Sequence, residues 1–352
     1  MESSKILFTS FLFFFSFVIN KYFLSVSKKN KFNLLKDDQF KKPQAFHLSP
    51  TSILGGITIY ISLILIFVYS FSYYDILYLD YFSFCTLFFL LGLMDDMKID
   101  LAPKFRLLLM GSLLILLIIF NDFYLEKTGL EFLNNLLEID IFSLFFICLC
   151  FLFIINGSNL IDGFNGLLGI HSLLILIILF FINFLNQNSE IAYILFCAIL
   201  LISIFLLFNF PKAQMFLGDG GAYLIGALIS VSVVKTSILN SQVSPFFFCI
   251  LLFYLFFEVF FSFFRKLLFV GQSPLLPDSK HLHMHLYKFL LKKSKNKLNS
   301  NYMVSVYTNL TYLFLIMPAI LFMKDGLFCR FYFFLLIIIY IYFYKTLSKK
   351  VR

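Results

Sequence analysis

The chain has 352 residues, of which 61% are hydrophobic and only 13% are charged. Soluble globular proteins carry roughly 25% charged residues, so this composition excludes an ordinary soluble protein and indicates one that contacts lipid. The net charge of +9 is divided among separate polar segments, which argues against nucleic acid as a partner.

Apolar segments recur along the whole chain, each near the length of roughly 20 residues that a helix needs to cross a bilayer. Because backbone groups find no water inside the bilayer, we expect an all-α polytopic membrane helix bundle of about 10–11 transmembrane helices. No segment is large enough to fold separately, so residues 1–352 are expected to form a single integral membrane domain. The candidate segments are residues 6–24, 53–72, 76–94, 105–121, 141–156, 166–185, 191–208, 221–237, 246–264, 302–323 and 329–344.

Lys and Arg orient the bundle, because cytoplasmic loops of membrane proteins carry an excess of both. A Lys-rich stretch follows the first apolar segment where a signal peptide would have a cleavage site, so we expect a retained helix. With the N-terminus outside, the 28 Lys and Arg residues all fall on the inner side except Lys5, Lys127, Lys235, Lys324 and Arg330. The sequence therefore predicts an outside N-terminus and a cytoplasmic C-terminus.

Four inner loops contain the unusual polar residues. Four of their carboxylates lie against the ends of apolar segments, where an unpaired charge is costly, so they are expected to face a cavity, a cation or a substrate. The alternative is that Asp219 caps a helix and that Asp95 and Asp96 are solvated. In chain order the loops hold Asp95, Asp96, Lys104 and Arg106; Asn156, Asn159 and Asp162; Gly218, Asp219, Gly220 and Gly221; and Asp278, His281, His283 and His285.

The residue types in these loops favour a hard divalent cation, Mg²⁺ with Mn²⁺ as the alternative, since oxygen ligands are present and thiolates are absent nearby. Mg²⁺ usually takes one or two protein carboxylates and completes its shell with water and phosphate oxygens. Residues 218–221 open an apolar segment, so their backbone N–H groups are also placed to meet a phosphate. Acids, glycines and bases on one face indicate a phosphoryl-transfer site.

His281, His283 and His285 are separated by one residue each, which leaves three interpretations: a zinc site, phosphate or sugar binding, or a solvated loop. His171 is expected to be hydrogen-bonded within the bundle. Glu258 lies within an apolar segment, and it is either a functional group or the acceptor of a structural hydrogen bond.

Taken in order, these motifs resemble those of the polyprenyl-phosphate N-acetylhexosamine-1-phosphate transferase family, of the glycosyltransferase family 4 type. The resemblance covers the chain from about residue 36 to 290 and is closer to initiators of surface-polysaccharide synthesis than to phospho-N-acetylmuramoyl-pentapeptide transferase. The chain departs from it at Asn165, where many members have Asp, and at Met110, where members often have Gln. It also departs at Met284, where members that act on UDP-N-acetylglucosamine often have His. The matching motifs are residues 42–56, which include His47, then 92–96, 156–166, 216–221 and 281–283.

The resemblance implies a membrane transferase. It would move an N-acetylhexosamine-1-phosphate from a UDP-sugar donor to a polyprenyl phosphate acceptor, giving polyprenyl-diphospho-sugar and UMP. This reaction initiates cell-surface polysaccharide or lipopolysaccharide O-antigen synthesis, with the peptidoglycan enzyme as the alternative. The family places it in the cell (inner) membrane, with its active site facing the cytoplasm, and a homodimer is compatible with it.

The resemblance also suggests roles for the candidate residues. The expected catalytic residues are Asp95, Asp96 and Asp162, and Asp219 is expected to hold Mg²⁺, shared with Asp96. Asp95 would orient or deprotonate the lipid phosphate, in a direct displacement. The expected substrate-binding residues are Asn156, Asn159, Lys104, Arg106, Arg265, His281, His283 and His47.

Two other classes of protein share some of these features. An ion-coupled transporter also has buried carboxylates, but its sites usually lie near the middle of the membrane. A non-catalytic scaffold would tolerate neutral substitutions at all four aspartates.

Overall fold

The computed structural model describes residues 2–28, 36–37, 51–99, 101–271, 273, 276 and 278–351. The described chain is an all-α bundle, apart from two short antiparallel strands in which Lys36 pairs with Ser52 and Asp37 with Thr51. In chain order the elements are α1 (Glu2–Lys28), β1 (Lys36–Asp37), β2 (Thr51–Ser52), α2 (Gly55–Tyr74), α3 (Leu79–Asp96), α4 (Pro103–Asn121), α5 (Glu131–Leu137), α6 (Asp140–Ile161), α7 (Leu167–Leu185), α8 (Ser189–Asn209), α9 (Gly218–Leu239), α10 (Pro245–Leu251), α11 (Phe253–Arg265), the π-helical turn η2 (Lys266–Val270), α12 (Leu282–Ser294), α13 (Lys297–Leu321) and α14 (Gly326–Val351).

Every apolar segment expected to cross the membrane is helical, but residues 246–264 form two helices instead of the single one expected. Within the described ranges, nine helices are long and apolar enough to span a bilayer, and α10 with α11 makes a tenth if this pair, bent by 75°, is one span. The segment expected at residues 76–94 forms α3, which is more polar because it carries Asp80, Asp95 and Asp96. The prediction of an all-α polytopic bundle is confirmed.

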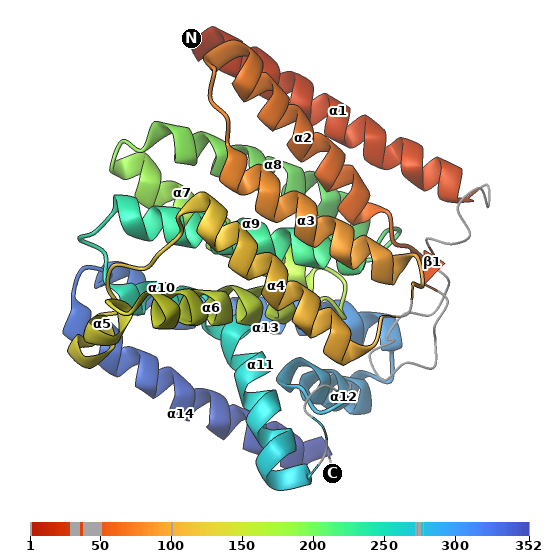
Figure 1. Ribbon diagram of the computed structural model, residues 1–352. Helices are drawn as coiled ribbons and strands as arrows, with labels where there is room; N and C mark the ends of the chain where they lie inside the picture. Colours follow the sequence, from red (N-terminus) through yellow and green to blue (C-terminus); the bar gives the residue numbers. More distant parts are fainter. Residues whose placement is uncertain are drawn as a thin grey trace.

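Helix α9 runs through the middle of the bundle (Figure 1), and most of its residues are buried. Two glycines bring neighbouring helices into direct contact with its first turn. A Cβ atom on Gly56 of α2 would lie 2.5 Å from Gly221 Cα, and one on Gly92 of α3 would lie 2.4 Å from the carbonyl oxygen of Asp219. Any side chain at Gly56 or Gly92 would therefore force α2 or α3 away from α9.

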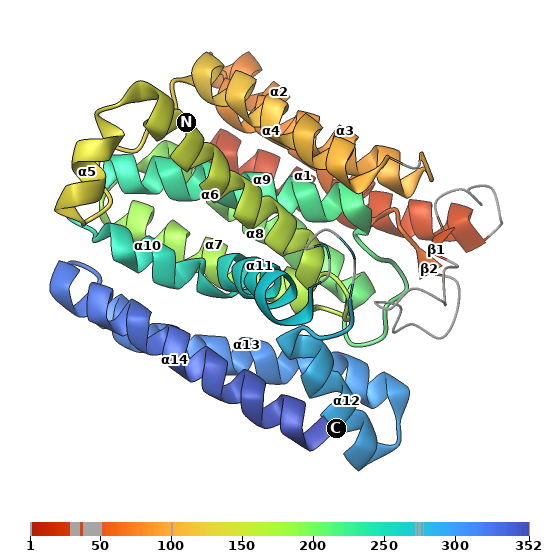
Figure 2. The same ribbon diagram turned by 60° about the horizontal axis from the view of Figure 1, so that its bottom comes forward.

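The two ends of the chain lie at opposite ends of the bundle (Figure 1). The end of α3 and the start of α9 lie together at the end that holds the C-terminus, while Lys235 of α9 pairs with Asp80 of α3 at the other end. Figure 2 shows α12, α13 and α14 packed along one side of the bundle. This arrangement places the loops that the sequence predicts to be cytoplasmic at one end of the bundle.

Candidate active site

Asp96 joins the end of α3 to the start of α9. Its Oδ1 accepts a hydrogen bond of 2.8 Å from the backbone N–H of Asp219, and its Oδ2 accepts one of 2.9 Å from Gly220. The first N–H groups of a helix have no partner inside that helix, so Asp96 caps α9 from another helix. The expectation that these N–H groups bind a phosphate is wrong for Asp219 and Gly220, because the Asp96 carboxylate occupies both.

Asp219 lies next to residues from α6. The Asn159 side chain donates a hydrogen bond of 2.7 Å from Nδ2 to Asp219 Oδ1. Asp162, one residue beyond the end of α6, is partly buried near Asp219 and Asp96. Burial, and then the negative charges of Asp219 and Asp96, raise the pKa of the Asp162 carboxyl well above its usual range. This crowding of carboxylates is relieved most directly by a bound cation.

Asp95 pairs with Arg106 from the start of α4, with 2.8 Å between Arg106 Nη1 and Asp95 Oδ2. The Asp95 side chain is 11% exposed and that of Arg106 is 32% exposed, so this pair remains within reach of solvent. Lys104 is exposed and makes no ion pair with the described aspartates. Asn156 donates to the Leu152 carbonyl and lies 3.9 Å from the Met110 sulfur, so its amide faces α4.

The donor set fits a magnesium ion whose coordination shell is completed by substrate. Among the described residues, no group of three or more His, Cys, Asp or Glu side chains could hold a metal ion by itself. Asp162 and Asp219 lie close enough to repel each other, and Mg²⁺ commonly uses one or two carboxylates together with phosphate oxygens and water. Asp96 accepts two backbone hydrogen bonds and Asp219 accepts one from Asn159, and the carboxylates of Asp219 and Asp162 are the candidates to hold the ion.

The histidine loop is held by the buried carboxylate of Glu258 and the partly buried one of Asp278. His281 Nδ1 lies 3.1 Å from Glu258 Oε2, and its Nε2 lies 3.4 Å from Asp278 Oδ1. Glu258 also accepts the backbone N–H of Leu282 at 3.1 Å. Asp278 in turn pairs with Arg265 at 2.7 Å. Both ring nitrogens of His281 and the Nη2 of Arg265 are thus in contact with carboxylates of the protein. Glu258 is an acceptor of structural hydrogen bonds, which was one of its two interpretations.

His283 and His285 are buried at the start of α12, so the solvated-loop interpretation is wrong. Burial lowers the pKa of both imidazoles to about 4. His283 Nδ1 lies 3.1 Å from the Tyr254 hydroxyl, and its ring packs against Phe164 at 5.8 Å, two residues after Asp162. Phe164 therefore joins the histidine loop to the aspartate cluster.

Three further residues that the sequence singled out, His171, Asn165 and His47, do not belong to the aspartate cluster. His171 is hydrogen-bonded within the bundle, with Nδ1 3.1 Å from Asn309 Oδ1, as expected. Asn165 donates from Nδ2 to the Pro211 carbonyl at 2.8 Å, so the departure at this position is a structural contact. His47 lies outside the described residues.

Sequence reasoning missed Tyr254 and the pairing of Asp278 with Arg265. Tyr254 stands four residues before Glu258, and residues at this spacing share one face of a helix. That spacing was a usable signal, because polar groups are rare in the apolar segment that contains both.

The aspartates come from the ends of α3 and α6 and from the start of α9, at one end of the bundle. A transporter site near the middle of the membrane is therefore not supported.

Comparison with known proteins gives the family. The model of glycosyl transferase family 4 matches residues 78–237. The chain is 31% identical over 242 residues to the phospho-N-acetylmuramoyl-pentapeptide-transferase of Dictyoglomus turgidum, covering 65% of this chain and 74% of that protein. It is 27% identical over 259 residues to the undecaprenyl-phosphate alpha-N-acetylglucosaminyl 1-phosphate transferase of Thermotoga maritima, covering 74% and 73%. The corresponding Escherichia coli K12 protein is 24% identical over 275 residues, covering 76% and 73%.

The matched region contains Asp95, Asp96, Arg106, Asn159 and Asp219, which the structure brings together at one end of a multi-pass bundle. The chain belongs to glycosyl transferase family 4 and is a membrane-embedded polyprenyl-phosphate sugar-1-phosphate transferase.

Proposed function

We propose that this protein transfers N-acetylhexosamine-1-phosphate from a UDP-sugar to polyprenyl phosphate at the cytoplasmic face of the cell (inner) membrane. The observation that supports the proposal is the convergence of four aspartates with Arg106 and Asn159 at one end of the bundle. Mg²⁺, with Mn²⁺ as the alternative, is the proposed cofactor, held by Asp219 and Asp162.

The two reactants are phosphates, so their mutual repulsion has to be offset. Asp219 and Asp162 would hold a Mg²⁺ ion, which would supply positive charge to offset this repulsion. Arg106 is proposed to hold the acceptor phosphate, and Asp95, which pairs with Arg106, is proposed to orient it. A phosphate monoester has a second pKa of about 6, so the acceptor is mostly deprotonated at neutral pH and the demand on Asp95 as a base is small. Positioning and electrostatic stabilisation are the main contributions of the protein.

The proposed reaction is a direct displacement. An oxygen of the acceptor phosphate forms a bond to the sugar-proximal phosphorus while the bond from that phosphorus to the UMP oxygen breaks, and UMP leaves with the electron pair. His283 is the proposed contact to the donor from the histidine loop, because its Nε2 has no hydrogen-bond partner among the described residues. His281, held between two carboxylates, would position that loop.

The proposed pathway is initiation of cell-surface polysaccharide synthesis. The likeness to the undecaprenyl-phosphate alpha-N-acetylglucosaminyl 1-phosphate transferases covers 74–76% of this chain, and that to the Dictyoglomus turgidum enzyme covers 65%. The identity of 31% to the latter keeps UDP-N-acetylmuramoyl-pentapeptide as the second candidate donor.

The test is release of UMP by purified protein given undecaprenyl phosphate, Mg²⁺ and one UDP-sugar at a time. We expect UDP-N-acetylhexosamines to be used and Asp219→Ala to lower the rate at least about 100-fold, the scale of losing a preorganised charged group. Use of UDP-N-acetylmuramoyl-pentapeptide alone would establish the second candidate.

A matched control is Asp122→Asn, which removes an exposed carboxylate just beyond the end of α4, far from the aspartates. It should keep wild-type activity. Retention of most activity by Asp219→Ala would show that Asp219 does not hold the metal.

A further inference from the structure

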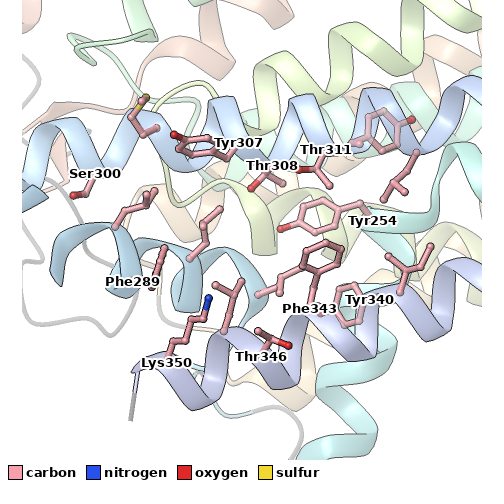
Figure 3. A pocket seen from close by; sticks show the side chains of 18 of the residues that line it. Tyr254, Phe289, Ser300, Tyr307, Thr308, Thr311, Tyr340, Phe343, Thr346 and Lys350 are labelled. Carbon is pink, nitrogen blue, oxygen red and sulfur yellow. The ribbon is translucent and has the colours of Figure 1, made fainter. Parts of the chain in front are cut away.

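A cavity of about 790 Å³ lies between α11, α12, α13 and α14, apart from the aspartate cluster. Its wall is mostly aliphatic and aromatic, with Tyr254, Tyr307, Tyr340 and Phe343 among the side chains that surround it (Figure 3). The volume falls within the range of about 300–1,000 Å³ that is usual for ligand sites. None of the aspartates of the active site lines it.

One end of the cavity is cationic. Lys293 in the last turn of α12 and Lys350 in the last turn of α14 both line it. The two helix ends are tied together, because Lys292 donates from Nζ to the Val351 carbonyl at 2.9 Å. Lys350 Nζ lies 5.5 Å from the centre of the Phe289 ring, at the end of the cavity where Figure 3 also shows Ser300. The described residues that line the cavity include no Asp or Glu.

The cavity opens sideways between α13 and α14. Tyr307 of α13 and Phe343 of α14 line it and are 47% and 45% exposed. Helix α13 packs against α12, α7 and α10, and α14 packs against α12 and α10, but α13 and α14 have only sparse contact with each other. Because α13 and α14 are membrane-spanning, the opening faces the hydrocarbon of the bilayer.

We propose that this cavity binds an anionic phospholipid of the surrounding bilayer, with an acyl chain among the aromatic side chains and the phosphate at Lys293 and Lys350. An apolar chamber with two cations at one end is complementary to such a lipid. The acceptor fits less well, because its phosphate has to reach aspartates that are carried by α3, α6 and α9.

The bound lipid would support the histidine loop. Tyr254 forms part of the cavity wall, and its hydroxyl lies 3.1 Å from His283 Nδ1. A chain packed against the Tyr254 ring would restrict that ring and so hold His283 in place. The lipid site is therefore separate from the reacting groups but adjoins one of the residues proposed to contact the donor.

The experiment measures lipid binding by native mass spectrometry of the full chain released from nanodiscs of phosphatidylcholine with or without phosphatidylglycerol. Wild type should retain phosphatidylglycerol in preference to phosphatidylcholine. The double variant Lys293→Gln/Lys350→Gln should bind phosphatidylglycerol about 25-fold more weakly, since each lysine near a lipid phosphate contributes about fivefold. The matched control Lys345→Gln/Lys349→Gln removes the same charge from exposed positions of α14 outside the cavity and should bind as wild type does.

A second variant tests the chamber independently of charge. Thr308→Trp, on α13 in the cavity wall, should exclude the lipid while the variant still unfolds cooperatively on heating. Equal weakening in the Lys345→Gln/Lys349→Gln control would overturn the proposal, as would equal retention of phosphatidylcholine. Displacement of phosphatidylglycerol by undecaprenyl phosphate added at an equal concentration would assign the cavity to the acceptor instead.

Discussion

Asp96 shows how one side chain can join two helix ends into one site. Each of its oxygens accepts a backbone N–H at the start of α9, and a hydrogen bond to a charged group contributes about 1.5–3 kcal/mol. The same contacts place Asp219 beside Asn159 and within the electrostatic reach of Asp162. Asp96 is therefore a positioning residue for Asp219 in this structure.

The buried imidazole of His285 makes stability depend on pH. Its folded-state pKa is about 4, below the ordinary value of about 6.5, so between these values the unfolded chain binds more protons than the folded one. The stabilisation is complete above pH 6.5 and is lost as the pH falls toward 4. We expect the melting temperature in detergent to fall across this window, measured by circular dichroism at a series of pH values.

The variant His285→Leu provides the comparison. Leu keeps an apolar side chain against the Tyr344 ring, which lies 5.2 Å from the imidazole, but cannot take up a proton. Its melting temperature should fall less steeply with acid than that of wild type, with the remaining slope reflecting His283, whose pKa is also about 4. Identical slopes would mean that His285 does not contribute.

The nature of the reacting residues could be predicted from sequence, but many of their partners could not. Acids at helix ends next to glycines indicated a phosphate and cation site, and the structure brings those acids together. The contact between Asp96 and the start of α9 joins residues 123 positions apart, and no local pattern encodes it. The same holds for Glu258 and His281, whose pairing depends on how α11 and α12 pack.

At the scale of helices, the glycine contact between α3 and α9 sets the site geometry. Gly92→Ala places a methyl group 2.4 Å from the Asp219 carbonyl oxygen, a distance that requires α3 to move. Because Asp95 and Asp96 are on α3, displacement by about 1 Å should lower kcat/KM on the order of 100-fold. The UMP-release assay measures this, and the melting temperature should fall as well.

Gly111→Ala in α4 is the control for that substitution. A Cβ atom there meets nothing within 4 Å, and Ala is favoured over Gly in a helix by about 0.5–1 kcal/mol. Activity should be unchanged and stability equal or slightly higher. Wild-type activity in Gly92→Ala would show that the α3–α9 contact can relax without disturbing the aspartates.

The positions of the helices followed from apolar segments, but the break at Leu252 did not. Kinks in helices usually coincide with Pro or Gly, and residues 246–264 contain neither. The bend of 75° between α10 and α11 depends on tertiary packing, in which Gly157 of α6 lies against the Leu255 backbone. The hydropathy of the sequence does not indicate such packing between helices.

At the scale of the molecule, the distribution of Lys and Arg predicts which side of the membrane holds the aspartates. Ser189 and Lys212 are exposed residues at opposite ends of α8, so the variants Ser189→Cys and Lys212→Cys report on the two sides of the membrane. In intact cells, a membrane-impermeant maleimide should label Ser189→Cys and not Lys212→Cys. After permeabilisation it should label both.

Wild type, whose six cysteines all lie within helices, provides the background. Labelling of Lys212→Cys alone in intact cells would place the aspartates outside, away from cytoplasmic nucleotide sugars, and would contradict the proposed function.

The direct contact of α2 and α3 with the α9 backbone determines which parts can move during turnover. Helices α2, α3 and α9 touch through glycine and cannot shift past one another without a backbone clash. The positions of Asp95, Asp96 and Asp219 are therefore preorganised before substrate binds. The histidine loop is held differently, because His281 and His283 are fixed by side-chain contacts with Glu258 and Tyr254. We therefore expect movement during turnover to be concentrated in the histidine loop rather than in the helix ends that carry the aspartates.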